Sequence, residues 1–572
     1  MNDTGQSWLS WFARGIILFG LLVITARLIE LQAIKADYYK SLADSNRIRR
    51  VAITSPRGEI MSREGDILVG NKSIAKKIIF DSKQGYVKTT DLAVNGQEIK
   101  ETTRDYLLAD EFSHVAGYLG EVREDEVGRI NPDCPQKGPF KLGQLVGRSG
   151  LEKEYECILS GVDGEVLIEV DTTGKEVRVL GIKEPIPGSD LKTNINKGLQ
   201  EFVSKTHKSK GAVVVTDAFG QVLALQSFPM FDPDSFINKA KSDYLSNILV
   251  ADSLPLFNRV VSGSYHPGSV FKPIVAIAAL TEEVIDKDYS FNDTGIIVVN
   301  GFTYSNWFFT QYGGKEGEIG LARALSRSTD TFFYKAGELL GIDNLVKWAS
   351  YFGFAKKTGI DLPGEVAGLV PSPKWKENTK GENWFLGNTY HFSIGQGDLQ
   401  TTPVQINSAI AALANGGELC SPQVAKKGKK NCRNIFFNKD DRQLVIDGMV
   451  GACKSGGTAY PFFDFKVKRE GDENKDGEGS WENTASGLAE GEDSGFVVCK
   501  TGTAETVKEN VTHAWFVAFA PTDSPEIVVT VLVEEGGEGS SVAAPITREI
   551  FDYWFNNETI VNFERYPKPN EL

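Results

Sequence analysis

The longest apolar stretch of the chain lies near its N-terminus. Trp8 to Ala26 carries a single charge, Arg14, and a helix of this length spans about 28 Å, close to the hydrocarbon thickness of a bilayer. The alternative is a cleaved signal peptide with its apolar core at Gly15 to Ala26. Because Ile24-Thr25-Ala26 fits a cleavage site poorly, we predict an uncleaved membrane anchor. Either interpretation places the rest of the chain outside the cytoplasm.

Alternating patterns typical of strands follow this segment. Glu30 to Arg50 has the polar pattern of a helical stalk, and Arg57 to Ile60 and Ile67 to Val69 alternate like strands around a turn. Further along, Gly211 to Val215 and Val222 to Gln226 predict two strands that are joined by an Asp/Gly turn. An extracytoplasmic region therefore begins directly after the stalk.

The remaining half of the chain is helical in its middle and strand-like at its end. Helical patterns dominate from residue 269 to about residue 455, and then Phe496 to Cys499, Ala514 to Ala518 and Ile527 to Val533 form apolar runs of strand length. Strands near both ends of a domain with helices between them favour one antiparallel sheet covered by helices. The predicted fold class is α+β.

Glu470 to Ser494 interrupts this pattern with nine Asp or Glu residues and one Lys. Such a composition is typical of a solvated insertion. Asp472 to Gly477 matches the opening of an EF-hand calcium loop, but position 12 is Asn483, where the loop needs a bidentate Glu. The pattern therefore favours an acidic insertion over a calcium site.

Length and charge narrow the class of protein. The 572 residues suit two or three domains. A net charge of -14 argues against a nucleic acid partner, because phosphates require clustered Lys and Arg.

Six cysteines agree with an oxidising compartment. Cys134 with Cys157, and Cys420 with Cys432, are close enough in sequence to pair locally, which leaves Cys453 and Cys499. Buried free thiols are the alternative, and the sequence does not rank the possible pairings. The cysteines and the five histidines show no zinc-type spacing.

The main candidate for catalysis is Ser269 with Lys272. A serine hydroxyl needs a neighbouring base to become a nucleophile, and positions i and i+3 of a helix share a face. Tyr265 to Gly268 predicts a turn, and Ile274 to Leu280 predicts a buried helix. Ser269 should therefore lie at a helix start, where unpaired backbone N–H groups can stabilise an oxyanion.

Two further motifs can complete this site. Ser328-Thr329-Asp330 lies where two helical stretches join, and Lys500-Thr501-Gly502-Thr503 ends the strand that begins at Phe496. Each motif alone is common and is usually a helix start, a helix cap or a turn. The ordered combination of S-x-x-K, an S-x-[DN] triplet and K-T-G is typical of class A β-lactamases and penicillin-binding proteins.

With its flanks, this set resembles the class B penicillin-binding proteins, the membrane-anchored transpeptidases of peptidoglycan synthesis. Arg57-Gly58-Glu59-Ile60 and Gly150-Leu151-Glu152-Lys153 are similar to the family's pedestal motifs. The other matching segments are Asn258-Arg259, Gly359-Ile360-Asp361-Leu362-Pro363, Gly395-Gln396-Gly397, Thr402-Pro403, Ala514-Trp515-Phe516 and Ala543-Ala544-Pro545. Asp330 replaces the asparagine of most members and, with Thr331 to Tyr334, resembles the penicillin-binding protein 2 branch of cell elongation.

The resemblance implies an elongated pedestal domain and a transpeptidase domain with a five-stranded antiparallel sheet covered by helices. We predict a cytoplasmic tail at 1–7, the anchor at 8–32, a pedestal with a reduced head at 33–190, the transpeptidase domain at 191–560 and a C-terminal tail at 561–572. The resemblance also implies localisation in the cytoplasmic (inner) membrane, with the catalytic domain on the periplasmic side.

The resemblance also implies roles for the site residues. Ser269 attacks a D-alanyl-D-alanine bond, Lys272 accepts its proton, Ser328 relays a proton to the leaving amine and Asp330 holds Lys272. Lys500 is a second cation that lowers the pKa of Lys272, and with Thr501 and Thr503 it binds the substrate carboxylate. Gly502 lets the substrate backbone approach the strand. The backbone N–H groups of Ser269 and Thr503 form the oxyanion hole.

Other functions remain open at this point. A division-type transpeptidase, a β-lactam-binding sensor or scaffold, and a serine β-lactamase share parts of this set. The partners implied are stem peptides ending in D-Ala-D-Ala, β-lactams and a membrane glycosyltransferase of the shape, elongation, division and sporulation (SEDS) family. We expect no cofactor and no metal, because Pro273 to Arg327 contains no His or Cys.

Overall fold

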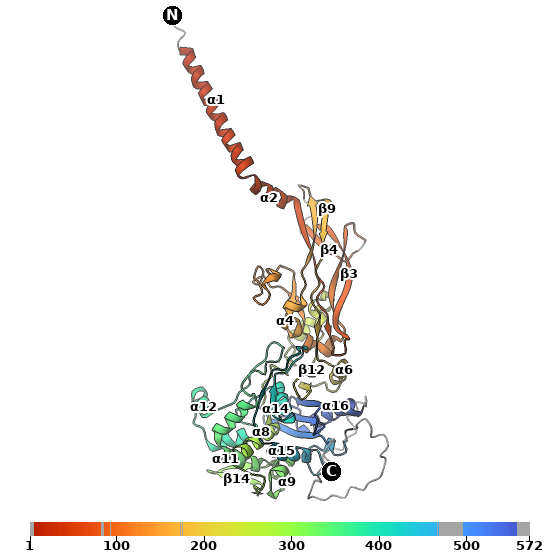
Figure 1. Ribbon diagram of the computed structural model, residues 1–572, viewed down its shortest axis with the longest axis vertical. Coiled ribbons are helices and arrows are strands. Elements are labelled where there is room, and N and C mark those ends of the chain that lie inside the picture. The colour runs from red at the N-terminus through yellow and green to blue at the C-terminus, as the bar shows by residue number, and fades with distance from the viewer. Residues whose placement is uncertain are drawn as a thin grey trace. The chain divides into compact units, whose positions relative to one another are not determined.

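The structure is a computed structural model that describes residues 5–81, 85–91, 93–171, 173, 175–465, 467 and 496–556 (Figure 1). The predicted acidic insertion at 470–494, with its calcium-like loop, lies outside the described residues. The same holds for the predicted C-terminal tail at 561–572.

The chain folds into two compact units, each assembled from separate segments. The first unit comprises Met1–Gly58, Asn71–Arg104 and Ser160–Ser189, and the second comprises Glu59–Gly70, Asp105–Leu159 and Asp190–Leu572. The predicted domain boundaries stay a prediction.

The N-terminal apolar stretch is helical, as predicted. Helix α1 (Gly5–Ile29) continues through a π-helix (Glu30–Ile34), and α2 (Ala36–Arg47) follows where a polar stalk is predicted. The helix from Trp8 to Ile34 is long and apolar enough to cross a membrane, and none of its apolar window is buried in the protein.

The rest of the first unit is built from antiparallel strands. One sheet has the order β1 (Ile48–Ile53), β8 (Gly164–Val170) and β9 (Glu176–Lys183). Strand β3 (Ile67–Asp81) pairs through its last five residues with β4 (Gly85–Thr89), and also pairs with β5 (Gln97–Tyr106). A small apolar cluster fills this unit, made of Val51, Ile53, Ile78, Ile99, Val166, Ile168 and Val170.

The second unit contains the predicted five-stranded sheet, and its antiparallel pairing is confirmed. The strand order is β12-β11-β21-β20-β19. The strands are β11 (Gly211–Thr216), β12 (Val222–Phe228), β19 (Val498–Glu505), β20 (Thr512–Ala520) and β21 (Ile527–Val533). Among the residues that the structure describes, strand β19 lies at an edge of the sheet and has no strand on its other side.

Helices cover both faces of this sheet, which the pattern also predicts. Helices α6 (Lys197–Lys205) and α16 (Ala544–Asn556) share an apolar cluster with one face. Helices α8 (Lys272–Thr281) and α14 (Pro403–Ala414) share the larger cluster with the other face. In Figure 1, α14 and α16 lie on opposite sides of the blue strands. Burial on both faces explains why β11, β20 and β21 read as continuous apolar runs.

Further helices and pairs of short strands complete the second unit. The helices are α3 (Ser113–Ala116), α4 (Gly150–Glu154), α5 (Glu156–Leu159), α7 (Ser242–Leu249), α9 (Trp307–Tyr312), α10 (Leu321–Ser326), α11 (Asp330–Tyr351), α12 (Pro373–Lys380), α13 (Leu386–Ser393) and α15 (Lys439–Ala452). The paired short strands are β6 (Leu119–Glu121) with β7 (Leu145–Gly147), β13 (Phe291–Asp293) with β16 (Gly317–Ile319), β14 (Ile296–Val299) with β15 (Phe302–Ser305), β17 (Glu418–Cys420) with β18 (Cys432–Asn434), and β2 (Ile60–Met61) with both β10 (Leu191–Lys192) and the start of β3.

The described residues include three disulfides. Cys134 bonds to Cys157 and Cys420 bonds to Cys432, which confirms both local pairs. Cys453, after α15, bonds to Cys499 in β19. The third disulfide therefore lies one residue before Lys500.

Candidate active site

Ser269 lies at the start of a helix, as predicted. It belongs to a 3₁₀ turn (Gly268–Phe271) that leads directly into α8, with Pro273 in the first turn. Gly268 has φ +58, and a Cβ there would lie 2.8 Å from the carbonyl oxygen of Thr503. The turn that carries the nucleophile thus packs so closely on β19 that only glycine fits.

Lys272 is completely buried and points at the second motif. Its Nζ donates to the backbone oxygen of Ser328 at 2.7 Å, to Ser328 Oγ at 3.2 Å and to Asp330 Oδ1 at 2.7 Å. A protonated lysine has three N–H groups, so all of them have acceptors. The contact to Ser328 Oγ is the longest, and it is the one that a neutral amine can give up most easily.

The hydroxyl of Ser328 lies between two amines. Lys500 Nζ donates to Ser328 Oγ at 2.8 Å and to the Thr501 carbonyl oxygen at 3.0 Å. Ser328 itself has φ +56, a left-handed conformation that costs a non-glycine residue free energy and occurs often at functional sites. The structure therefore brings together four of the five predicted catalytic groups, Lys272, Ser328, Asp330 and Lys500, beside the helix turn of Ser269.

Burial makes both amines easier to deprotonate. Burial lowers the pKa of Lys272, and the carboxylate of Asp330 opposes this shift. Burial, and then the charge of Lys272, lower the pKa of Lys500 well below its ordinary value, again opposed by Asp330. Two cations and one carboxylate in a sealed site favour the loss of one proton.

Asp330 is held by residues that the sequence analysis missed. Its Oδ2 accepts the backbone N–H of Trp307 at 3.0 Å, and its own N–H donates to Asn306 Oδ1 at 3.2 Å. Asn306 in turn donates to the buried Asp293 at 3.2 Å. These residues carry no motif, and their only signal in the sequence is that Asn and Asp are common in turns.

The strand motif lies inside β19, not at its end as the apolar pattern suggests. Lys500 and Thr501 are buried, and Thr503 is exposed. Gly502 has a packing role besides the predicted one, because a Cβ there would lie 2.9 Å from Val270 and 3.0 Å from Trp515. This glycine lets the nucleophile's turn pack against the strand.

Gln396 hydrogen-bonds to the open edge of β19. Its Nε2 donates to the Thr503 carbonyl oxygen at 3.2 Å, and its Oε1 accepts the Glu505 N–H at 3.3 Å. The N–H and C=O of one strand residue point to the same side, so the Thr503 N–H also faces this edge. An extended ligand can therefore reach that N–H.

Arg259 and Tyr265 brace the turn that precedes Ser269. Arg259 is fully buried and donates from Nε to Glu534 Oε1 at 2.9 Å, and the Tyr265 hydroxyl donates to the same oxygen at 2.6 Å. Glu534 follows β21 directly. The motif Asn258-Arg259 thus serves the placement of the nucleophile.

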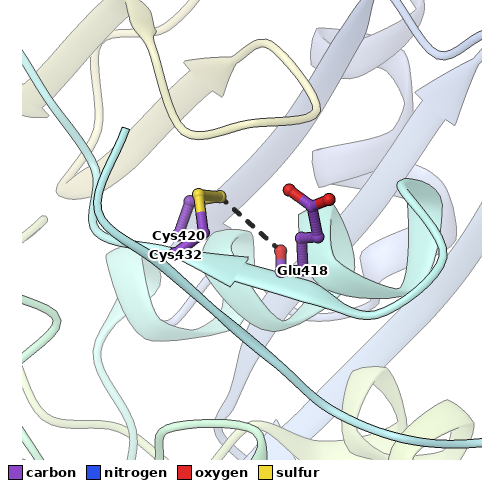
Figure 2. Close-up of side chains that lie close together, drawn as sticks. All are labelled: Glu418, Cys420 and Cys432. Atoms are coloured by element: carbon purple, nitrogen blue, oxygen red, sulfur yellow. Dashed lines mark hydrogen bonds between the residues drawn. A yellow bond between two sulfur atoms is a disulfide. The ribbon is translucent and has the colours of Figure 1, made fainter. Parts of the chain in front are cut away.

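The structure offers one group of possible metal ligands among the described residues. Ligand atoms of Glu418, Cys420 and Cys432 lie within 4.8 Å of one another. Figure 2 shows that the two sulfur atoms are bonded to each other. A disulfide has no thiolate to offer, so this group does not fit a metal ion.

Family comparisons agree with the geometry of the serine site. Residues 211–552 match the family described as the penicillin binding protein transpeptidase domain. Residues 87–193 match the penicillin-binding protein dimerisation domain. The first match contains Ser269, Ser328 and Lys500.

Two curated relatives are similar over nearly the full chain. Peptidoglycan D,D-transpeptidase MrdA of Acinetobacter baumannii is 30% identical over 95% of this chain and 87% of the relative. The protein of the same name from Escherichia coli K12 is 29% identical over 94% of this chain and 93% of the relative.

Solved structures are similar in fold. PBP2 of Pseudomonas aeruginosa in complex with WCK 5153 has a TM-score of 0.69 and 30% identity, covering 88% of this chain and 96% of that one. A PBP2–MreC complex from Helicobacter pylori has a TM-score of 0.71 and 24% identity, covering 90% and 99%. A structure on the coordination of polymerization and crosslinking by a peptidoglycan synthase complex has a TM-score of 0.70 and 25% identity, covering 97% and 99%.

Proposed function

The chain belongs to the penicillin-binding protein transpeptidase family, and from this premise we propose how its residues divide the reaction. The protein is a serine-type peptidoglycan D,D-transpeptidase that crosslinks stem peptides in cell elongation. The observation that carries our assignment of roles is the buried Lys272, which lies one turn after Ser269 and bonds to both Ser328 and Asp330.

In the first step Lys272 takes the proton of Ser269. A neutral Lys272 keeps its bonds to the Ser328 carbonyl oxygen and to Asp330, and releases the longer contact to Ser328 Oγ, so that its lone pair is available. The Ser269 oxygen then attacks the carbonyl carbon between the two D-alanines. The oxyanion that forms is stabilised by the N–H groups of Ser269 and Thr503.

In the second step the C–N bond breaks and D-alanine leaves. Its nitrogen needs a proton, and Ser328 relays to it the proton that Lys272 took from Ser269, so Ser328 keeps its hydroxyl and Lys272 becomes neutral again. The acyl group now sits on Ser269 as an ester. An amine from a second stem peptide attacks this ester, its surplus proton returns through the same lysine, and Ser269 is released.

The strand motif recognises the end of the donor peptide. The terminal carboxylate favours the charged form of Lys500, which binds it together with the hydroxyl groups of Thr501 and Thr503. A β-lactam offers a strained amide and a carboxylate to the same groups, and so acylates Ser269.

Mass spectrometry with a fluorescent penicillin tests the assignment. The expected result is one covalent adduct on Ser269 and crosslinking of stem peptides that vanishes in Ser269→Ala. Crosslinking that survives this substitution contradicts the assignment. Acylation without any crosslinking identifies a sensor, and rapid hydrolysis of the β-lactam identifies a lactamase.

We also propose that the N-terminal helix anchors the protein in the cytoplasmic membrane with both folded units outside the cytoplasm. The helix from Trp8 to Ile34 has the necessary length, and three disulfides suit an oxidising compartment. Alkylation of the cysteines in intact cells is the test, and free thiols throughout contradict the proposal.

A SEDS-family glycosyltransferase is the proposed partner. The support is the fold similarity to a structure of a peptidoglycan synthase complex that coordinates polymerization with crosslinking. A reconstituted polymerase assay should show faster glycan synthesis when this protein is added. No stimulation contradicts the partnership.

A further inference from the structure

Thr458 contacts the strand motif without belonging to any of the three motifs. It lies in the loop after α15, and its Oγ1 is 2.8 Å from the Oγ1 of Thr501. Within the part of the chain that the structure describes, this is the one hydrogen bond that the Thr501 hydroxyl makes. Thr501 is buried, so its hydroxyl depends on Thr458 for its orientation.

The loop that carries Thr458 is fixed to β19. Cys453 caps the end of α15 and bonds to Cys499, two residues before Thr501 in the strand. Ala459 donates from its N–H to the Ala452 carbonyl oxygen at 2.9 Å. The loop is thus closed on its own helix and covalently tied to the strand, which keeps the two threonine hydroxyls together.

The chemistry of the ligand sets the direction of the hydrogen bond. A carboxylate only accepts hydrogen bonds, so a Thr501 hydroxyl that binds it has to donate its proton to it. The lone pairs of Thr501 can then accept the proton of Thr458. We propose that Thr458 is a positioning residue that donates to Thr501 and so aims the Thr501 proton at the terminal carboxylate of the donor peptide. This inference rests on the proposed function.

A comparison of Thr458→Val with Thr458→Ser tests this role. Valine keeps the shape of threonine without the hydroxyl, and serine keeps the hydroxyl. The probes are benzylpenicillin and its methyl ester, which differ in the carboxylate alone. The readout is the second-order rate constant for acylation of Ser269, followed by intact-protein mass spectrometry.

We expect Thr458→Val to slow acylation by the free acid about tenfold, the loss typical of one hydrogen bond. Acylation by the ester should stay as in the natural protein, and Thr458→Ser should behave like the natural protein with both probes. The ratio of the two rate constants is informative because loosened packing would slow both probes alike.

The outcomes separate this inference from the proposed function. An equal loss with both probes, or no loss with either, overturns the positioning role. A natural protein that does not distinguish acid from ester overturns it as well, because no carboxylate is then recognised. If neither probe acylates the natural protein at all, the proposed function itself fails.

Discussion

Two places in the described part of the chain each bring two lysines and one carboxylate together, with opposite burial. In the first unit, Lys76 and Lys88 both form ion pairs with Glu101. The carboxylate side chain is 2% exposed, and the lysine side chains are 30% and 25% exposed. Burial alone would raise the pKa of Glu101, but the hydrogen bonds from Lys88, from the backbone of Thr54 and from Lys76 outweigh it and lower that pKa.

In the second unit the positions are reversed. Lys272 and Lys500 are completely buried, whereas the side chain of Asp330 is 13% exposed. The two lysines here have lowered pKa values, and burial is the first cause for both. The two triplets thus contain the same kinds of charge with the burial reversed, and the pKa is lowered for the carboxyl of Glu101 in one and for both amines in the other.

The difference shows what turns an ion cluster into a site for proton transfer. A lysine that reaches water keeps its charge at little cost, so the triplet around Glu101 stabilises the fold. A charged lysine that is completely buried costs free energy because water does not solvate it, and the loss of its proton removes this cost. The triplet around Asp330 is therefore suited to proton transfer. The burial of the amines separates the two cases.

Removal of a lysine from each triplet should give the largest contrast. Lys272→Met removes the base while it fills the same space, and we expect acylation of Ser269 by penicillin to slow about 10³-fold. The matched change Lys88→Met should leave acylation unaltered and lower the free energy of unfolding by about 1–2 kcal/mol, because Glu101 keeps Lys76 and Thr54 as partners.

Stopped-flow labelling and thermal unfolding of both variants measure this contrast. A normal acylation rate in Lys272→Met would remove Lys272 from its role as the base. A large loss of acylation in Lys88→Met would show that the two triplets are not independent, which contradicts the comparison.

The pH dependence of acylation should show a smaller effect. Acylation requires a neutral Lys272, so the rate should rise with pH through a midpoint below the ordinary lysine pKa of about 10.4. Asp330 raises the pKa of Lys272, so Asp330→Asn should move this rise to lower pH. A shift in the other direction contradicts this electrostatic account.

Asp330→Asn should also lose some stability. The Asp330 carboxylate accepts from Lys272 with one oxygen and from the Trp307 N–H with the other. An amide that keeps the first contact turns its NH₂ group towards the Trp307 N–H, and two donors then face each other. We expect a cost of about 1–3 kcal/mol, so the position of the rate midpoint, not the absolute rate, is the quantity to compare.

The sequence was sufficient for the parts of the site that depend on local spacing. Ser269 and Lys272 lie on one helix face, and the apolar runs around Val213, Phe516 and Val529 identify central strands. These signals need only a few neighbouring residues. The extent of β19 was missed because the apolar pattern ends at Cys499, whereas backbone pairing continues to Glu505 along a polar edge.

Contacts between distant segments were not predictable in this way. Glu534 binds Arg259 across 275 positions of sequence, and Asn306 orients the backbone of Asp330 across 24. Neither Glu534 nor Asn306 belongs to a motif or to a periodic pattern. The burial of Lys272 and Lys500, on which the chemistry depends, also arises from packing of segments that the sequence alone does not bring together.

Salt should produce the smallest effect and should separate the triplets by their access to water. Raising NaCl from about 0.1 M to 1 M shortens the screening length from about 10 Å to 3 Å. The lysines around Glu101 are partly exposed, so salt should weaken their ion pairs. The difference in unfolding free energy between the natural protein and Lys76→Met should then shrink from about 0.5–1 kcal/mol towards zero. The first-order acylation rate at saturating penicillin should change little, because the side chains of Lys272 and Lys500 are buried in the protein. If the acylation rate fell with salt in parallel with the stability difference, solvent would have to enter the triplet of Lys272, Lys500 and Asp330. The difference in burial would then not explain why one triplet transfers protons and the other stabilises the fold.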